Sequence, residues 1–97
     1  MGIKIVIIGA GEVGYNLTKA LSKENYDLTV IDIDPEKCQR INNSIDAHVI
    51  MGDGASQRIL QEIDMSQIDY LLALSRVDEV NLVAAKNAYE MGAKKII

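Results

Sequence analysis

The 97-residue chain lacks several features that mark other classes of protein. Its single cysteine, Cys38, excludes an internal disulfide and is typical of a reducing cytoplasm. Acidic residues outnumber basic ones by 14 to 10, and the net charge of −4 argues against a nucleic-acid partner bound through its phosphates. No apolar run approaches the roughly 18 residues of a membrane span, so we expect no direct insertion into a membrane. The first residues lack a cationic region and a signal-type core, which predicts no export.

Groups that would support catalysis or metal binding are also scarce. The single histidine, His48, lies in the apolar stretch 47–51, which favours a packed or edge histidine over an acid–base catalyst. Cys38 falls within a predicted helix and is interpreted as a small packed side chain rather than a nucleophile. No set of His, Cys, Asp and Glu has the spacing of metal ligands. The sequence therefore predicts a protein that is not an enzyme and has no metal site.

What the chain does contain is a glycine motif near its N-terminus. The apolar run 3–8 breaks into Gly9-Ala10-Gly11-Glu12-Val13-Gly14, the pattern Gly-x-Gly-x-x-Gly, and a helical pattern follows. In this motif the first glycine permits a tight turn, the second lets the backbone approach a pyrophosphate, and the third lets the helix pack close to the strand. The free N–H groups and positive dipole end of that helix then face the diphosphate.

An acidic residue follows the motif where a nucleotide site needs one. Asp32 ends a second apolar strand, close to the roughly 20 residues after the motif where a ribose-binding carboxylate belongs. A carboxylate there repels a 2′-phosphate, so NAD-type or adenosine ligands are favoured over NADP. The alternatives are a turn that binds nothing and a solvated carboxylate at a strand end. The order of strand, glycines, helix, strand and acid favours the nucleotide site.

The order of apolar segments predicts an α/β fold. We expect strands at about 4–8, 28–31, 47–51, 70–74 and from 95, and helices at about 13–23, 35–43, 57–62 and 78–91. On the first helix, the apolar face is expected to comprise Val13, Leu17, Ala20 and Leu21. The alternation predicts one domain, 1–97, with a Rossmann-like, doubly wound parallel sheet of strand order 3-2-1-4-5. Since the chain ends on the fifth strand, we expect a fragment of a longer protein, truncated after that strand, or a protein whose open edge a partner covers.

Further candidate residues follow strands at the same sheet edge. Gly52 and Asp53 are explained equally well by ligand contact near the adenine and by a turn with positive φ at the glycine and an Asx-turn at the aspartate. Ser75 either caps the next helix or contacts the ligand, and Arg76 is either solvated or reaches a phosphate or carboxylate. Glu12 puts negative charge beside the expected pyrophosphate, and we expect it to point to solvent or toward a neighbouring subunit.

Together these motifs resemble a known family. The segments Gly-Ala-Gly-Glu-Val-Gly at 9–14, Val-Ile-Asp-Ile-Asp-Pro at 30–35, Gly-Asp-Gly-Ala at 52–55 and Ala-Leu-Ser-Arg-Val-Asp-Glu-Val-Asn-Leu at 73–82 carry the resemblance. They are similar to the N-terminal nucleotide-binding domain of TrkA-type potassium uptake regulators, called KTN or RCK. The resemblance covers essentially the whole chain, and residues 78–81 are its most specific part.

The resemblance implies a cytoplasmic regulatory subunit at the inner face of the cell membrane. Such a subunit binds NAD(H), and in related members ATP, ADP or AMP, and passes that state to a membrane potassium transporter. The implied ligand contacts are Gly9, Ala10, Gly11, Glu12, Val13, Asp32, Ser75 and Arg76. We also expect Gly14 and Ile33 to belong to the cofactor site. Members that favour ATP often carry a basic residue where this chain has Glu12. The family also tends to place an arginine just beyond the fifth strand.

The sequence is also compatible with two other functions, and it predicts an oligomeric state. The chain is alternatively the NAD-binding half of a dehydrogenase, or a dimerisation domain that has lost ligand binding. Apolar residues of the last helix exceed what one buried face requires, which predicts a homo-oligomer. These residues are Leu82, Val83, Ala85, Ala88 and Tyr89.

Overall fold

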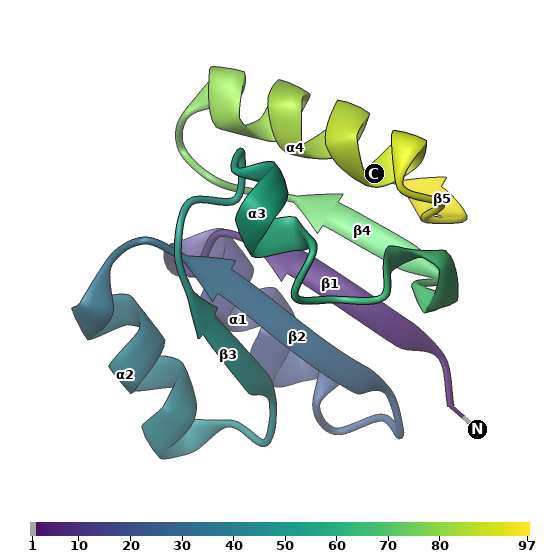
Figure 1. Ribbon diagram of the computed structural model, residues 1–97. Helices are drawn as coiled ribbons and strands as arrows, with labels where there is room; N and C mark the ends of the chain where they lie inside the picture. The colour runs from purple at the N-terminus through teal and green to yellow at the C-terminus, as the bar shows by residue number, and fades with distance from the viewer. Residues whose placement is uncertain (1) are drawn as a thin grey trace.

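A computed structural model describes residues 2–97, so only residue 1 of the predicted domain lies outside the described residues (Figure 1). One parallel sheet contains β1 (Lys4–Ile8), β2 (Asp27–Asp32), β3 (His48–Met51), β4 (Tyr70–Ala73) and β5 (Lys95–Ile96). The helices are α1 (Glu12–Leu21), α2 (Pro35–Ser44), α3 (Gln57–Leu60) and α4 (Asp78–Glu90), and a 3₁₀ turn spans Met65–Gln67. The strand order β3-β2-β1-β4-β5, with every pairing parallel, confirms the predicted topology.

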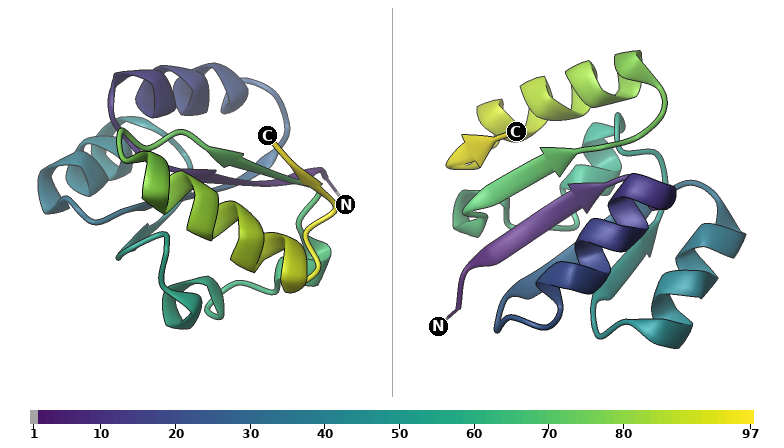
Figure 2. Two further views of the ribbon diagram at one scale, coloured as in Figure 1. Left: turned by 90° about the horizontal axis from the view of Figure 1, so that it is seen from above. Right: turned by 180° about the vertical axis from the view of Figure 1, so that it is seen from behind.

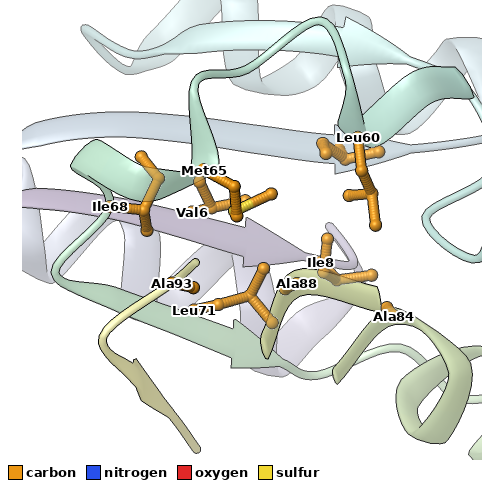
Figure 3. Close-up of a cluster of buried hydrophobic side chains, with 10 residues drawn as sticks. Val6, Ile8, Leu60, Met65, Ile68, Leu71, Ala84, Ala88 and Ala93 are labelled. Carbon is orange, nitrogen blue, oxygen red and sulfur yellow. The ribbon is translucent and has the colours of Figure 1, made fainter. Parts of the chain in front are cut away.

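Helices cover both faces of the sheet. Figure 2 shows α1 and α2 on one face and α3 and α4 on the other. The central strand β1 alternates between them, because Ile5 and Ile7 join the core under α1 and α2 while Val6 and Ile8 join the core under α3 and α4. The second core also takes Leu60 from α3 and Ala84 and Ala88 from α4 (Figure 3). A strand buried on both faces reads as a continuous apolar run, as this one does.

Local signals in the sequence fix several element boundaries. The carboxylate of Asp34 accepts a hydrogen bond from the Glu36 N–H at 2.9 Å, so Asp34 caps α2 as predicted. Gly92 has a φ of +108° just after α4, the left-handed conformation that ends many helices. Ser56 accepts a bond from the Ile59 N–H at 3.5 Å and caps the short α3.

The predicted apolar face of α1 is wrong in part. Its buried residues are Gly14, Tyr15 and Thr18, whereas Val13 is 65% exposed and Ala20 is exposed too. The helix is rotated so that Gly14 faces the turn after β1, and the Thr18 hydroxyl donates to the Gly14 carbonyl at 2.6 Å. This rotation leaves Val13 at the exposed start of α1, beside the carboxyl ends of the strands.

Candidate functional site

The three glycines of the motif have different surroundings at the carboxyl edge of the sheet. Gly9 has a φ of +106°, and its N–H donates to the Ile31 carbonyl at 2.8 Å. A Cβ at Gly9 would lie 2.8 Å from the backbone of Ser75, and a Cβ at Gly14 would overlap the carbonyl oxygen of Gly9. Both positions therefore require glycine for the packing of the protein itself.

Gly11 is different, because the folded chain does not require its small size. Apart from its neighbours in the chain, a Cβ there would lie within 4 Å of Arg76 Nε alone among the described residues, at an ordinary van der Waals distance of 3.9 Å, so the space around Gly11 is otherwise open. Its backbone, with φ −70° and ψ −163°, is one that any residue adopts. Gly11 immediately precedes α1, where N–H groups of the first turn lack helical partners. Its missing side chain leaves room for another molecule to approach that helix end.

Asp32 is held between the glycine loop and the start of α2. Its Oδ2 accepts a hydrogen bond from the Ala10 N–H at 2.7 Å, and its Oδ1 accepts one from the Asp34 N–H at 2.8 Å. A carboxylate offers about four acceptor positions, so two remain after these bonds. The side chain is partly exposed, next to the exposed Ile33. Asp32 is thus a fixed anion with spare acceptor capacity beside Gly11.

Glu12 is exposed but turns toward α2. Its Oε1 lies 3.3 Å from Arg40 Nη1, and the Arg40 guanidinium stacks 3.7 Å from the centre of the Tyr15 ring. The Tyr15 hydroxyl in turn lies 3.0 Å from Ser44 Oγ. This hydrogen bond, together with the nearby Arg40, lowers the pKa of Tyr15. Sequence reasoning missed Arg40, which stands 28 residues from Glu12 and carries no spacing signal.

The loop after β4 carries Ser75 and Arg76 to the glycine motif. Ser75 does not cap α4: its hydroxyl bonds the backbone of Val77, which is itself the N-cap residue. The side chain of Asn81 instead makes two bonds to the backbone of Ser75. Arg76 is exposed, and its Nε faces the open space at Gly11. The structure therefore brings Arg76 together with the motif, across the sheet edge from Asp32.

Gly52 and Asp53 follow β3 at the same edge. The turn interpretation is right for Asp53, whose Oδ1 accepts from the Ala55 N–H at 2.9 Å in an Asx-turn. It is wrong for Gly52, which has no positive φ. A Cβ at Gly52 would approach Ile59 Cδ1 to 2.6 Å, so close packing against α3 accounts for this glycine. The Gly52 N–H also donates to the Asp32 carbonyl at 3.0 Å, which places this loop beside Asp32.

Other chemistry-bearing residues lie apart from this cluster. His48 is exposed at the start of the edge strand β3, the end opposite the glycine loop. Cys38 is buried, its thiol donates to the Asp32 carbonyl at 3.2 Å, and burial raises the pKa of that thiol. Within residues 2–97 no group of His, Cys, Asp and Glu is arranged to hold a metal ion. In the same range no helix has the length and apolar character needed to cross a membrane.

Comparisons with solved structures find the same fold in several proteins. A chain described as "GsuK channel bound to NAD" superposes with a TM-score of 0.82 at 16% identity, covering 99% of this chain and 17% of that one. The Kef CTD of Shewanella denitrificans in AMP-bound form gives a TM-score of 0.77 at 22% identity, covering 96% of this chain and 56% of that one. Apo saccharopine dehydrogenase from Saccharomyces cerevisiae gives a TM-score of 0.76 at 16% identity, covering 93% of this chain and 20% of that one. At these identities the likeness shows the fold alone.

Sequence comparisons are more specific. A Trk system potassium uptake protein trkA homolog 1 from Methanosarcina mazei is 48% identical over 86 residues, covering 89% of this chain and 20% of that protein. A Trk system potassium uptake protein TrkA homolog from Archaeoglobus fulgidus is 37% identical over 95 residues, covering 98% of this chain and 21% of that protein. The chain thus spans about a fifth of the length of these curated relatives. The model of the TrkA-N domain matches residues 5–97, which confirms the resemblance seen in the motifs: the chain belongs to the TrkA-N domain family.

Proposed function

We propose that this chain is a nucleotide-sensing domain that binds NAD(H), with AMP, ADP and ATP as competing ligands. The observation that carries the proposal is the open space at Gly11. The neighbouring Ala10 N–H donates to the fixed carboxylate of Asp32, and a Cβ at Gly11 would make only an ordinary contact with Arg76 Nε, at 3.9 Å. Packing explains the other two glycines of the motif but not this one. A diphosphate fits the space chemically, because it needs close backbone approach, a helix N-terminus and a nearby cation.

The proposed ligand position follows from the chemistry of each group. Asp32 uses its two remaining acceptor positions for the hydroxyls of the adenosine ribose. The exposed Ile33 lies beside the adenosine, with Gly52 and Asp53 at its outer edge. The phosphates lie over Gly11 and the first turn of α1, where the backbone N–H groups of Glu12 and Val13 point toward them. For a dinucleotide, the second nucleoside extends toward Ser75 and Arg76 beyond β4.

The proposed role is regulation of potassium uptake. We propose that residues 1–97 form the nucleotide-binding unit of a longer protein, peripheral to the inner face of the cell membrane in the cytoplasm, with a membrane potassium transporter as its partner. The names of the relatives support this role. A domain of this kind signals when two conformations bind the nucleotides with different affinities, since only that difference shifts the equilibrium between them.

A homo-oligomer is part of the proposal. On α4, Leu82 is 71% and Tyr89 is 72% exposed, and Val83 is exposed beside them. Ala88 is fully buried in the core, so it is one of the predicted residues that face the sheet. The three exposed residues support association through the outer face of α4. Sedimentation of the unaltered chain and of Leu82→Lys at high protein concentration tests this association. If both are strict monomers, the proposed homo-oligomer is wrong.

A dehydrogenase shares the fold but is not the function proposed here. The likeness to saccharopine dehydrogenase is one of fold, at 16% identity. The histidine of this chain, His48, lies at the opposite edge of the sheet from Gly11, where it cannot reach a ligand placed over the motif. We therefore propose that the bound dinucleotide acts as a signal rather than as a redox partner.

Titration calorimetry with NAD, NADH, ATP, ADP and AMP tests the proposal directly. We expect binding by the unaltered chain and loss of NADH binding in Gly11→Val, whose side chain fills the open space. His48→Ala, at the opposite edge, is the matched control and keeps full affinity. Thermal unfolding of both variants shows that they are folded. The proposal fails if no member of the panel binds at millimolar concentration, or if Gly11→Val binds NADH as the unaltered chain does.

A further inference from the structure

Asn81 makes an unusual pair of hydrogen bonds at the start of α4. Its Oδ1 accepts from the Ser75 N–H at 2.9 Å, and its Nδ2 donates to the Ser75 carbonyl at 2.9 Å. One side chain thereby satisfies both backbone groups of a residue six positions earlier in the chain. The side chain is partly buried, so these bonds are shielded from water to some extent. Of the twenty side chains, only an amide offers the donor and the acceptor side by side in this way.

The residue held by Asn81 packs directly on the glycine loop. A Cβ at Gly9 would lie 2.8 Å from the Cα and the N of Ser75, so the two backbones are in contact there. The preceding residue is also fixed, because the Leu74 N–H donates to the Ile8 carbonyl at 2.8 Å. Any displacement of Ser75 therefore changes the relation between the loop after β4 and the motif after β1.

Arg76 directly follows Ser75, so the position of its backbone depends on that of Ser75. Its Nε lies 3.9 Å from the position of a Cβ at Gly11, although the side chain itself is exposed. An exposed arginine has many rotamers, and ordering it costs free energy when it binds a ligand. A fixed backbone at the preceding residue restricts where the guanidinium can reach. The contacts thus run from Asn81 through Ser75 to Arg76 and the space above Gly11.

We infer that Asn81 is a positioning residue for the dinucleotide, which it does not itself contact. It holds the loop after β4 so that Arg76 faces the phosphates and the second nucleoside lies against Ser75. This inference rests on the proposed function, and it extends that function to discrimination between ligands. AMP occupies the side near Asp32 and ends with its phosphate over Gly11, whereas a dinucleotide continues past Gly11 toward β4, where Arg76 faces its second phosphate. Asn81 therefore favours NADH over AMP.

The test compares NADH and AMP binding in Asn81→Ala with binding in the unaltered chain. We expect the dissociation constant for NADH to rise about five- to twenty-fold and that for AMP to change less than about two-fold, since only the dinucleotide reaches the displaced loop. Asn87→Ala is the matched control. Asn87 also lies on α4 and donates to a loop backbone, that of Ala55 at 3.2 Å, so its loss should lower stability without changing the ratio of the two affinities.

A double variant checks that Asn81 acts through Arg76. In Arg76→Ala, which removes the guanidinium, the further change Asn81→Ala should weaken NADH binding much less than it does alone. Asn81→Gln keeps both polar groups on a longer side chain and should retain part of the NADH preference, which provides a second variant if the alanine form does not fold. Calorimetry gives the affinities, and thermal unfolding gives the stability of each variant.

The outcomes separate this inference from the proposed function. If the unaltered chain binds neither NADH nor AMP, the proposed function is wrong and the inference falls with it. If both ligands bind and Asn81→Ala weakens them equally, Asn81 is merely structural and only the inference is overturned. Full additivity of Asn81→Ala and Arg76→Ala also overturns it, because the two residues would then act independently.

Discussion

Two aspartates bind the backbone at the two ends of the central strand β1. At its carboxyl end, Asp32 of β2 accepts a bond from the Ala10 N–H at 2.7 Å. At its amino end, Asp69, which precedes β4, accepts a bond from the Lys4 N–H at 2.9 Å. The two carboxylates make the same kind of contact at opposite edges of one sheet, yet only the edge at Asp32 carries the features of a nucleotide site.

The difference lies in what surrounds each carboxylate. The second oxygen of Asp32 accepts a backbone bond from Asp34, whereas that of Asp69 lies 3.4 Å from the ammonium of Lys94, which pairs with its charge. Helices begin at the carboxyl edge of a parallel sheet and end at the amino edge, so free N–H groups gather only at the first. The amino edge does have a hollow of about 140 Å³ beside Lys4, but none of the α-helices α1 to α4 begins among the residues that line it; the short 3₁₀ turn Met65–Gln67, whose N-cap is Asp64, does. The direction of the strands therefore determines which aspartate is available to a ligand.

The largest effect is expected from a methyl group added at the carboxyl edge. Gly14→Ala should destabilise the fold by about 3 kcal/mol, the upper end of the range for overpacking, because the new Cβ overlaps the Gly9 carbonyl. Gly11→Ala should cost less than about 1 kcal/mol, since it meets open space. Urea unfolding of the two variants measures the difference. Equal losses of stability would mean that Gly11 is as tightly packed as Gly14.

The two aspartates can be compared directly by removing each in turn. Asp32→Ala should weaken NADH and AMP binding about ten- to hundred-fold, since a charge-assisted hydrogen bond is worth about 1.5–3 kcal/mol. Asp69→Ala should leave both affinities unchanged, because that carboxylate lies at the amino edge. Calorimetry measures the binding. Urea unfolding measures the stability, because each variant also loses a hydrogen bond to the backbone at one end of β1. An unchanged dissociation constant in Asp32→Ala would remove Asp32 from the site.

The comparison also shows what a sequence can and cannot predict. The strand order and the position of Asp32 at the carboxyl end of β2 were predictable, because alternation of apolar segments and the spacing after the glycines are local patterns. The hydrogen bond from the Ala10 N–H to Asp32 was not predictable, because it depends on the register in which two strands pair. The Asx-turn at Asp53 was predictable because it depends on neighbouring residues in the sequence. The close packing of Gly52 against Ile59 was not predictable, because it depends on the tertiary fold.

Errors arose where a tertiary contact overrides a local pattern. Val13 fits the apolar face of α1 by its spacing, but the close approach of Gly14 to Gly9 fixes the rotation of the helix and leaves Val13 exposed. The pairing of Glu12 with Arg40 joins two helices 28 residues apart and involves ordinary surface residues. Asn81 stood out in the sequence as part of a specific motif, but its bonds to Ser75 required the loop geometry.

A smaller effect is expected from the charge of Glu12, which contributes to the electrostatic potential at the carboxyl edge of the sheet. Two unit charges at ~4 Å interact by about 4 kcal/mol at an effective dielectric of ~20, so Glu12 opposes the terminal phosphate of ATP. Arg40, 3.3 Å from Glu12, cancels part of this field, and both side chains are exposed. We therefore expect NADH or AMP to bind only several-fold more tightly than ATP.

Two variants change this ligand preference in opposite directions. Arg40→Ala leaves the charge of Glu12 uncompensated and should increase the preference for NADH over ATP a few-fold. Glu12→Arg should narrow or reverse it. Competition titrations in moderate salt measure the ratio, and Arg58→Ala, on α3, controls for the loss of a positive charge elsewhere. If the unaltered chain binds ATP more tightly than NADH, Glu12 does not act on the phosphates.

The smallest effect is expected at the amino edge, where Asp69 links stability to pH. The hydrogen bond from the Lys4 N–H, with a further contribution from Lys94, lowers the pKa of Asp69 below its ordinary value. A carboxyl group whose pKa is lower in the folded state stabilises the fold above its unfolded pKa of about 3.9 and loses that contribution as the pH falls through the folded pKa. Asp69→Asn should therefore lower the unfolding free energy slightly at pH 7, and the difference from the unaltered chain should shrink in acid. Urea unfolding over a pH series measures this, with NADH binding at pH 7 unchanged in the variant. A difference that stays constant with pH would mean that Asp69 contributes through packing alone, and a loss of NADH binding would show that the two ends of β1 are not independent.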